Sequence, residues 1–325
     1  SIDILEIHAT GVEDSRVLGT IKKKEMKYQF QLIITGFILI LSFSRTLGQE
    51  AWLSTPESIN QFRQQVEQIK PDSAKFEVSI LDKTINLNDR QVGIRIYNSD
   101  STNVKPGLIY IHGACWVAGS LNSHDEICRY LSKKTDVVVI AIDYRLAPEN
   151  KYPSSHNDVY DASNWIFKHA EELGIDKNKF AISGESAGAY FAASTVLRAI
   201  DSENSPDFQF QLLVYAALDG GGSSWTECKD LYFTSQEEVR SRYGSPLWSD
   251  NLKGLPLTYN VYGEHEISRA EEELYIRKLK ENDVEVKSYM CEDTGHDVIN
   301  WGSVKSETEA HLKAIEYIKE GFKIE

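Results

Sequence analysis

The feature that most constrains the fold of this chain is a regular alternation of apolar runs with helical patterns. Each run is short and almost continuously apolar, which is typical of parallel strands covered on both faces. Helical patterns separate most of the runs, and this order predicts one doubly wound α/β domain. We expect strands at 107–112, 137–144, 180–184, 210–216, 257–263 and 284–290, and helices at 124–134, 156–173, 187–201, 268–281 and 306–321.

Two segments ahead of this alternation complete the expected sheet. Residues 76–80 and 91–97 alternate apolar with polar side chains, as half-buried antiparallel strands do. Together with the apolar runs, they predict a mostly parallel central sheet of about eight strands flanked by helices. Before them, the polar, glutamine-rich pattern of residues 55–69 predicts an amphipathic helix that Pro71 stops.

The N-terminal region has the pattern of a targeting segment. Residues 22–27 are Lys-Lys-Lys-Glu-Met-Lys, and no charged residue follows between Tyr28 and Ser44. A basic flank, a short apolar stretch and small residues after it predict a secretory signal peptide over 26–48. Residues 1–25 would then be an upstream extension that the natural product lacks, and residues 49–325 would form a single domain.

A retained membrane anchor is the main alternative for this apolar stretch, although spanning a bilayer needs about 20 apolar residues. A buried core helix is a third interpretation. The expected location is therefore secreted or periplasmic, or anchored in a membrane with the domain outside the cytoplasm. A membrane partner is expected only if the segment is retained.

Composition excludes one class of partner and leaves the pairing of the cysteines open. The 325 residues are 41% hydrophobic and 26% charged, as in soluble globular proteins. The formal net charge of −14 argues against a nucleic-acid partner, because phosphate backbones bind basic surfaces. Export would favour disulfides, yet free buried thiols are at least as compatible with so few cysteines. The four, without the paired spacing of a zinc site, are Cys115, Cys128, Cys228 and Cys291.

One small-residue turn lies between an expected strand and an expected helix. It reads Gly184-Glu185-Ser186-Ala187-Gly188, a Gly-x-Ser-x-Gly pattern. Such an elbow lifts a serine oxygen clear of the sheet and brings strand and helix so close that small residues are required. A plain tight turn also uses small residues. The apolar strand before it and the alanine-rich helix after it favour Ser186 as a nucleophile.

A second turn follows another expected strand and reads YIHGACWVAGS over residues 110–120. A serine nucleophile needs backbone N–H groups directed at the oxyanion that forms on its substrate, and a small-residue loop at this place supplies them. A tight strand exit, for which His-Gly alone would serve, is the alternative. The expected oxyanion hole consists of Gly113, Ala114, Cys115 and Ala187.

The catalytic base is sought among histidines that follow a core strand in the last third of the chain. His296, in CEDTGHDV, follows the strand expected at 284–290. His265, in YGEHEIS, is the competitor. The chain order of serine, acid and histidine favours His296, with the acid in the loop after the strand at 257–263.

These segments resemble the hormone-sensitive-lipase-like branch of the α/β-hydrolases, the bacterial carboxylesterase and arylacetamide deacetylase type. The string Asp-Tyr-Arg-Leu-Ala-Pro-Glu at 143–149 is highly specific to that family, and the likeness extends over residues 75–320. The resemblance implies an α/β-hydrolase fold and a serine hydrolase of carboxylic esters, with Ser186 as nucleophile and His296 as base. It implies Glu266 as the acid, where the family has the Asp of an Asp-Pro-Leu motif. It implies no cofactor and no metal ion.

The chain departs from the family pattern in both turns. The family's His-Gly-Gly-Gly is His-Gly-Ala-Cys here, and its Gly-Asp-Ser-Ala-Gly-Gly is Gly-Glu-Ser-Ala-Gly-Ala. Backbone amides of Ala114 and Cys115 can still bind an oxyanion, at a cost in energy if their φ angles are positive. Some relatives have lost catalysis and bind ligands instead, but they typically lack the histidine that this chain keeps.

The expected cap over the site is small and consists of residues 50–72 and 217–250. A small cap predicts an open, shallow acyl pocket and a short-chain, acetyl-type ester as substrate. Alternatives are acylated carbohydrates or amides as substrates, or a catalytically weak ligand-binding protein. The expected substrate-binding residues are Trp116, Glu185 and Tyr190. Further aromatic residues expected in the pocket lining, or else in the core, are Trp225, Tyr232, Phe233 and Trp248. Nothing in the sequence indicates an oligomeric state.

Overall fold

The computed structural model describes residues 53–68, 75–98, 103–203, 205–296, 304 and 307–324. The chain divides into two compact units, Ser1–Ser54 and Thr55–Glu325, and every helix and strand described below belongs to the second. The signal peptide expected at 26–48 and the extension expected at 1–25 lie outside the described residues and stay predictions. Within the described part of the chain, no helix is long and apolar enough to cross a membrane.

One eight-stranded sheet organises the second unit, as the sequence predicts. Its strand order is β1-β2-β4-β3-β5-β6-β7-β8, and the pairs β1–β2 and β2–β4 are antiparallel while the remaining pairs are parallel. The strands are β1 (Ser79–Asn86), β2 (Gln91–Asn98), β3 (Lys105–Ile111), β4 (Val138–Asp143), β5 (Ile175–Glu185), β6 (Phe210–Val214), β7 (Leu257–Gly263) and β8 (Val286–Cys291).

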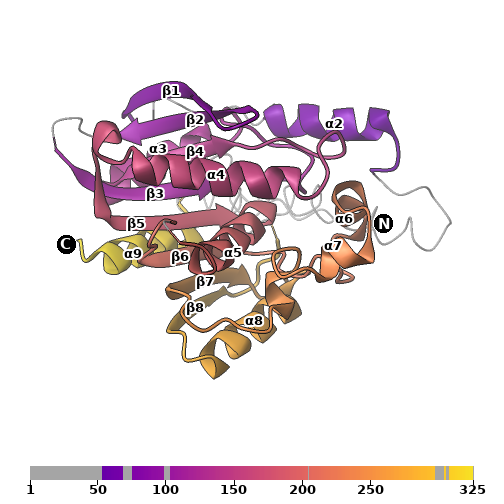
Figure 1. The fold of residues 1–325 in the computed structure, drawn as a ribbon. Helices are drawn as coiled ribbons and strands as arrows, with labels where there is room; N and C mark the ends of the chain where they lie inside the picture. The colour runs from indigo at the N-terminus through magenta and orange to yellow at the C-terminus, as the bar shows by residue number, and fades with distance from the viewer. Residues whose placement is uncertain are drawn as a thin grey trace, which may run out of the picture. The chain divides into compact units, whose positions relative to one another are not determined.

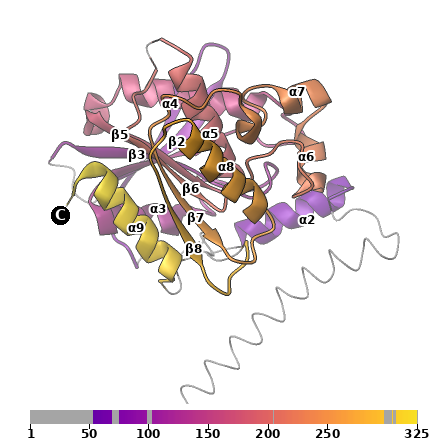
Figure 2. The ribbon, with the colours of Figure 1, turned by 90° about the horizontal axis from the view of Figure 1, so that it is seen from below.

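Helices cover both faces of the sheet, which explains the continuous apolar runs of the central strands. Figure 2 shows α3 and α9 on one face and α4, α5 and α8 on the other. Helix α5 is buried at every position from its first residue to Leu197, so its alanine-rich sequence is that of a helix enclosed by protein. The helices are α3 (Asp125–Thr135), α4 (Ser154–Lys168), α5 (Ala187–Ile200), α8 (Arg269–Glu281) and α9 (Glu309–Phe322).

The first strand lies later in the chain than the alternation at 76–80 predicts. Phe76 is buried in the core ahead of the strand, and β1 begins at Ser79. In β1 only Ile85 is buried, so the strand carries almost no apolar alternation. Its backbone pairing with β2 defines it, and a pattern of side chains cannot reveal that pairing in an exposed edge strand. Helix α4 is also shorter than expected, because it ends at Lys168 and a separate 3₁₀ turn follows at Glu171–Leu173.

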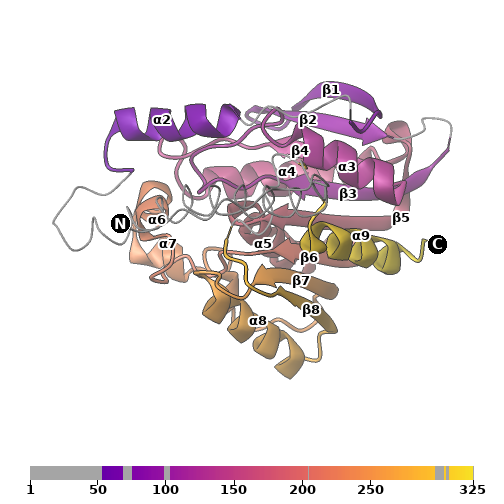
Figure 3. The same ribbon diagram turned by 180° about the vertical axis from the view of Figure 1, so that it is seen from behind.

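Short helices stand at one end of the sheet, where β5 hands over to α5 (Figures 1 and 3). Helix α2 (Pro56–Glu67) is close to its expected bounds and starts at a capping box on Thr55. Its Arg63 donates to the carbonyls of Val117 at 2.7 Å and Ala147 at 2.8 Å, which ties α2 to the 110–120 loop. The segment after β6 holds helices that the sequence analysis does not anticipate: α6 (Thr226–Tyr232), α7 (Gln236–Arg240) and the 3₁₀ turn Pro246–Trp248.

Candidate active site

Ser186 occupies a strained turn between β5 and α5. Its φ of 52° and ψ of −119° are angles that residues with a side chain rarely adopt. A Cβ on Gly184 would lie 2.4 Å from the carbonyl carbon of Gly188, and a Cβ on Gly188 would lie 2.0 Å from the carbonyl oxygen of Ile111. Both glycines are therefore required by backbone contacts, and the turn has the form of a nucleophile elbow.

A continuous chain of polar contacts joins Ser186, His296 and Glu266. The Oγ atom of Ser186 lies 2.9 Å from Nε2 of His296. On the other side of the ring, Nδ1 lies 2.8 Å and 2.9 Å from the two carboxylate oxygens of Glu266. The competitor His265 is exposed, and its backbone N–H donates to Thr294. The structure thus brings together the three residues that the sequence proposed as nucleophile, base and acid.

Glu266 is buried and firmly held. Its Oε1 accepts hydrogen bonds from the backbone N–H of Ser268 at 3.1 Å and from the Ser268 hydroxyl at 2.9 Å. Burial by itself raises the pKa of Glu266, but His296 and the hydrogen bonds from His296 and Ser268 outweigh it, and the pKa lies below its ordinary value. Such a carboxylate stabilises the fold above its unfolded pKa and loses that contribution as the pH falls through its folded pKa. Glu266 is consequently ionised at neutral pH.

Three backbone N–H groups of the two small-residue turns have no acceptor among the described residues: those of Ala114, Cys115 and Ala187. The fourth expected donor is a correction. The N–H of Gly113 donates to Oε1 of Glu185 at 2.6 Å, so it is committed to the protein and is not available to an oxyanion. Gly113 is required for another reason, because a Cβ there would lie 2.6 Å from that same oxygen.

The 110–120 loop holds three consecutive non-glycine residues at positive φ. The angles are 75° at Ala114, 59° at Cys115 and 61° at Trp116. A left-handed residue with a Cβ costs about 1–2 kcal/mol, so the departures from a glycine-rich loop store strain.

We expect Ala114→Gly to keep or raise kcat/KM on a short-chain ester. Glycine reaches the observed φ without strain, and this gain offsets the roughly 0.4–1 kcal/mol that glycine loses to unfolded-chain entropy. Chemical denaturation should then show a free energy of unfolding equal to or above that of the parent. Ala118→Gly in the same loop, where φ is not positive, is the matched control and should destabilise. A folded Ala114→Gly protein with a hundredfold loss would show that the methyl group itself is needed.

Cys115 forms a disulfide with Cys228 across 113 residues of sequence, whereas Cys128 and Cys291 are free and buried. This pairing, which the sequence left open, links the 110–120 loop to helix α6. Cys115 therefore contributes its side chain as well as its backbone amide. The side chain anchors the loop to the cap.

Removing this disulfide through Cys115→Ala with Cys228→Ala is expected to lower the free energy of unfolding by about 2–5 kcal/mol. A cross-link over so long a segment restricts the unfolded chain strongly. We also expect kcat/KM to fall, because the strained loop loses its tether. Denaturant unfolding with and without a phosphine reductant measures the effect, and the Cys128→Ala protein is the control that must keep its sensitivity to reductant. Equal stability of the parent with and without reductant would contradict this role.

The three residues expected to contact substrate are engaged elsewhere, and this is a second correction. Glu185 is buried; its Oε1 accepts from Gly113 and lies 2.9 Å from Nε2 of His124, and its Oε2 accepts from Tyr215 at 2.6 Å. Tyr190 is fully buried and its hydroxyl donates to the carbonyl of Gly244 at 2.9 Å. Trp116 is buried against the ring of Tyr190, at a centroid distance of 5.4 Å. These three side chains therefore make their contacts with other protein groups.

The further aromatic residues expected in the pocket lining differ in their surroundings. Tyr232 is fully buried and Trp248 is 55% exposed. Trp225 packs on the His296 ring with a centroid distance of 4.3 Å. Tyr215 lies 4.7 Å from the same ring, and the sequence analysis treated it only as part of a strand. Its place immediately after β6 was the sole available signal.

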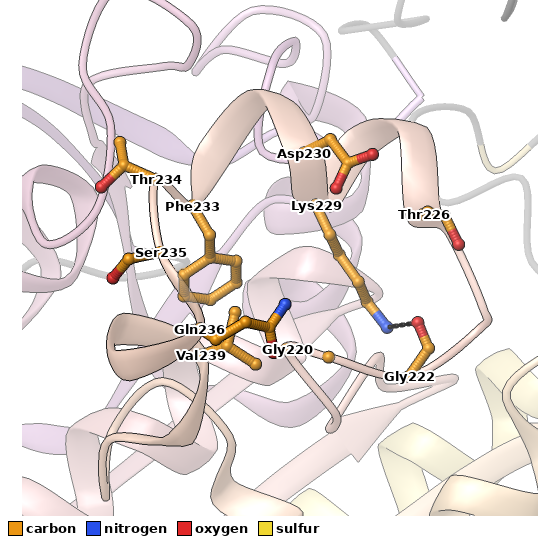
Figure 4. Close-up of a pocket in the computed structure, with 11 residues that line it drawn as sticks. Gly220, Gly222, Thr226, Lys229, Asp230, Phe233, Thr234, Ser235, Gln236 and Val239 are labelled. Atoms are coloured by element: carbon orange, nitrogen blue, oxygen red, sulfur yellow. Dashed lines mark hydrogen bonds between the residues drawn. The ribbon is translucent and has the colours of Figure 1, made fainter.

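A cavity of about 520 Å³ lies beside the cap helices α6 and α7 (Figure 4). It is lined by the Gly220–Gly222 turn, by Phe233 and by the stem of Lys229, and no residue of the serine, histidine and acid set lines it. The ammonium of Lys229 is 3.4 Å from the carbonyl of Gly222. Burial lowers the pKa of Lys229 despite the nearby Glu271 and Asp219. In the described residues, one group has metal-ligand atoms within 4.8 Å of one another, namely Glu264, His265 and Asp293, and two of its members are exposed.

Comparison with known proteins agrees with this geometry. A family model described as an alpha/beta hydrolase fold matches residues 108–300. An arylesterase of Saccharolobus solfataricus is 30% identical over 257 residues, which cover 74% of this chain and 83% of that protein. Arylacetamide deacetylase of Oryctolagus cuniculus is 25% identical, with 86% of this chain and 88% of that protein covered. The solved structure of a Pyrobaculum calidifontis esterase superimposes with a TM-score of 0.76 at 28% identity, over 86% of this chain and 97% of that one.

Proposed function

This chain belongs to the alpha/beta hydrolase fold family, in its hormone-sensitive-lipase-like branch, and is a serine hydrolase of carboxylic esters; from that premise we propose that it cleaves short-chain, acetyl-type esters through Ser186, His296 and Glu266. One observation carries the assignment of residues. The polar chain from Ser186 through His296 to Glu266 begins at a strained elbow, and Ala187 directly after the serine has an N–H without an acceptor in the described protein.

The proposed reaction begins when His296 takes the proton of Ser186 as Oγ attacks the ester carbonyl. Glu266 orients the ring through Nδ1 and stabilises the imidazolium that forms. The tetrahedral oxyanion accepts hydrogen bonds from the amides of Ala114, Cys115 and Ala187. His296 then gives its proton to the departing alcohol, and the acyl-enzyme remains. Water deprotonated by His296 attacks the acyl carbon, and Ser186 recovers its proton as the acid leaves.

The short-chain preference is supported by what fills the space behind the oxyanion loop. Trp116, Tyr190 and Tyr232 are all fully buried there, and the Trp116 ring stacks on Tyr232 at 6.2 Å and meets Tyr190 edge-on. Rings in close contact leave no channel for a long acyl chain in that direction. A deacetylase among the relatives supports the removal of a two-carbon acyl group.

A series of p-nitrophenyl esters tests this preference. We expect kcat/KM to be highest for acetate or butyrate and to fall by about tenfold or more at octanoate, since each methylene in a restricted pocket is worth a measurable factor. A maximum at the longest acyl chain would contradict the proposal. Full activity in the Ser186→Ala protein would contradict the nucleophile, and no hydrolysis of any ester would leave the ligand-binding alternative.

An amide-cleaving or carbohydrate-deacetylating activity is the second candidate. The likeness to arylacetamide deacetylase favours the amide branch of this candidate. Phenyl acetate, acetanilide and a peracetylated sugar compared at equal concentration separate the possibilities. Preference for acetanilide or for the sugar by kcat/KM would replace the simple ester as the proposed substrate.

We further propose that the protein is exported. The Cys115–Cys228 disulfide supports this location, because such bonds persist in oxidising compartments. Mass spectrometry of the N-terminus after expression in a secreting host should find a start between residues 45 and 49. A product that retains residues 30–43 and sediments with membranes would favour the anchored alternative.

A further inference from the structure

Two aromatic rings contact the imidazole of His296. The Tyr215 ring meets it edge-on at a centroid distance of 4.7 Å and an interplanar angle of 68°. The Trp225 ring lies at 4.3 Å with an angle of 49°. Both residues come from the segment that follows β6, Tyr215 at its start and Trp225 at the N-terminus of α6. Two rings from one segment thus converge on the proposed base.

Both aromatic residues adopt backbone angles that bulky residues avoid. The φ angle is 37° at Tyr215 and 57° at Trp225. A bulky side chain at positive φ persists only where surrounding contacts outweigh the strain, and such positions cluster at functional sites. The strained backbone at Tyr215 and Trp225 is therefore consistent with a functional role for both rings.

Trp225 is held by the helix that follows the catalytic acid. The hydroxyl of Ser224 donates to Oε1 of Glu271 at 2.6 Å, and the backbone N–H of Asp219 donates to Oε2 of Glu271 at 3.1 Å. Glu271 is in the first turn of α8, which begins just after Glu266. The same helix that carries the acid's loop thus fixes both ends of the turn leading to Trp225. The buried indole N–H of Trp225 has no hydrogen-bond partner among the described residues, and the indole ring packs on the ring of His296.

Tyr215 is held in place by Glu185. Its hydroxyl donates to Oε2 of Glu185, whose Oε1 accepts the N–H of Gly113. Burial and the neighbouring Glu185 raise the pKa of Tyr215, so the hydroxyl remains a neutral donor. The buried carboxylate of Glu185 therefore links Tyr215 to the 110–120 loop, and Glu185 is the residue immediately before Ser186.

We propose that Tyr215 and Trp225 form an aromatic clamp that positions His296 between Ser186 and Glu266. This inference rests on the proposed function, which makes His296 the base. Hydrogen bonds at Nδ1 and Nε2 fix two atoms of the ring but leave it free to swing about the line that joins them. Two rings packed against the imidazole hinder that swing and exclude water, which strengthens the polar contacts of the triad. The imidazolium that forms during attack also lies within cation–π range of both rings.

The first test compares Trp225→Ala with Trp225→Phe on p-nitrophenyl acetate. We expect kcat to fall about tenfold in the alanine variant with KM within about twofold, because a misplaced base affects the chemical step and not the binding of a small ester. Phenylalanine keeps a flat ring in place and should restore most of the loss. The matched control is Trp165→Ala, since Trp165 stacks on His169 at 3.9 Å outside the site and should leave kcat unchanged. A folded Trp225→Ala protein with the parent kcat would overturn the clamp.

The second test reads the contact itself. A protonated imidazole quenches indole fluorescence more than a neutral one, so Trp225 reports the charge of the ring it touches. Among the described residues, His296 contacts Glu266, Ser186, Tyr215 and Trp225. The measurement is made in the Trp165→Ala background, because Trp165 stacks on His169 and would report the charge of that ring as well. We expect a pH-dependent change in emission in this background that disappears when either His296→Ala or Trp225→Phe is added.

The two readouts separate the two failures. An active esterase whose emission does not depend on His296 would overturn the clamp and leave the proposed function intact. A folded protein that hydrolyses no ester but keeps the His296-dependent emission would overturn the proposed function, with the ring contact supported.

Discussion

Replacing Ser186 by alanine is expected to lower kcat for ester hydrolysis by about 10⁴- to 10⁶-fold, the range seen when a serine hydrolase loses its nucleophile. Without Oγ, no acyl-enzyme can form, and only the oxyanion amides and substrate binding are left to accelerate direct attack by water. Steady-state kinetics on p-nitrophenyl acetate measure the loss. Active-site labelling with a fluorophosphonate should be abolished in the same protein.

The fold should survive this change, because within the described residues the Ser186 hydroxyl makes one hydrogen bond, to His296. Thermal unfolding checks this point. Ser194→Ala is the matched control, since Ser194 is a buried serine of the same helix whose hydroxyl donates to the Tyr243 carbonyl. We expect it to cost some stability and little activity. A loss of less than tenfold in Ser186→Ala would remove this residue from the proposed mechanism.

The second large effect is expected from Glu266→Gln, with a fall in kcat of about 10⁴-fold, by analogy with the same carboxyl-to-amide change in a serine protease. The side chain keeps nearly the same size, but an amide cannot stabilise the imidazolium. An amide N–H directed at Nδ1 would also favour the wrong tautomer of His296. The rate loss should diminish at high pH, where an unpaired imidazole is more often neutral.

Glu264→Gln is the control for this change, because Glu264 lies two residues away and its Oε2 accepts the backbone N–H of Asp293 instead of facing the base. We expect it to leave kcat within a few-fold of the parent. The reverse pattern, a damaging Glu264→Gln and a mild Glu266→Gln, would show that the acid is misassigned. Asp297→Asn is a further comparison, at a position outside the described residues.

Much of the sheet and the centre of the site were predictable because their signals are local. Continuous apolar runs locate β4, β6 and β7 closely, since strands buried on both faces admit few polar residues. The glycines beside Ser186 are also visible in the sequence as a Gly-x-Ser-x-Gly pattern. The contact that requires Gly184 lies within the turn, whereas the contact that requires Gly188 is with Ile111 of β3. His296 was identified from its place after a late strand and from chain order.

The bounds of the edge strand and the helices within residues 217–250 escaped prediction for the opposite reason. Strand β1 is defined by hydrogen bonds to β2, and its exposed side chains carry no periodic pattern. Helices α6 and α7 are short, and a short helix owes its stability to the packing around it more than to its own composition. The Cys115–Cys228 link, which no spacing of cysteines revealed, joins α6 to the 110–120 loop.

By itself, the sequence determined the order of strands and helices and the small-residue turn at Ser186, and it indicated Ser186, His296 and Glu266, which the structure brings within hydrogen-bond distance. Each of these depends on neighbours within a few residues or on chain order. Only the tertiary structure decided that Gly113 donates to Glu185 and not to an oxyanion, that Glu185 and Tyr190 are buried, and that two rings contact His296. Glu185 and Gly113 are 72 residues apart. A carboxylate can accept hydrogen bonds from many donors, and the packing of the strands and helices decides which distant donor lies within hydrogen-bond distance.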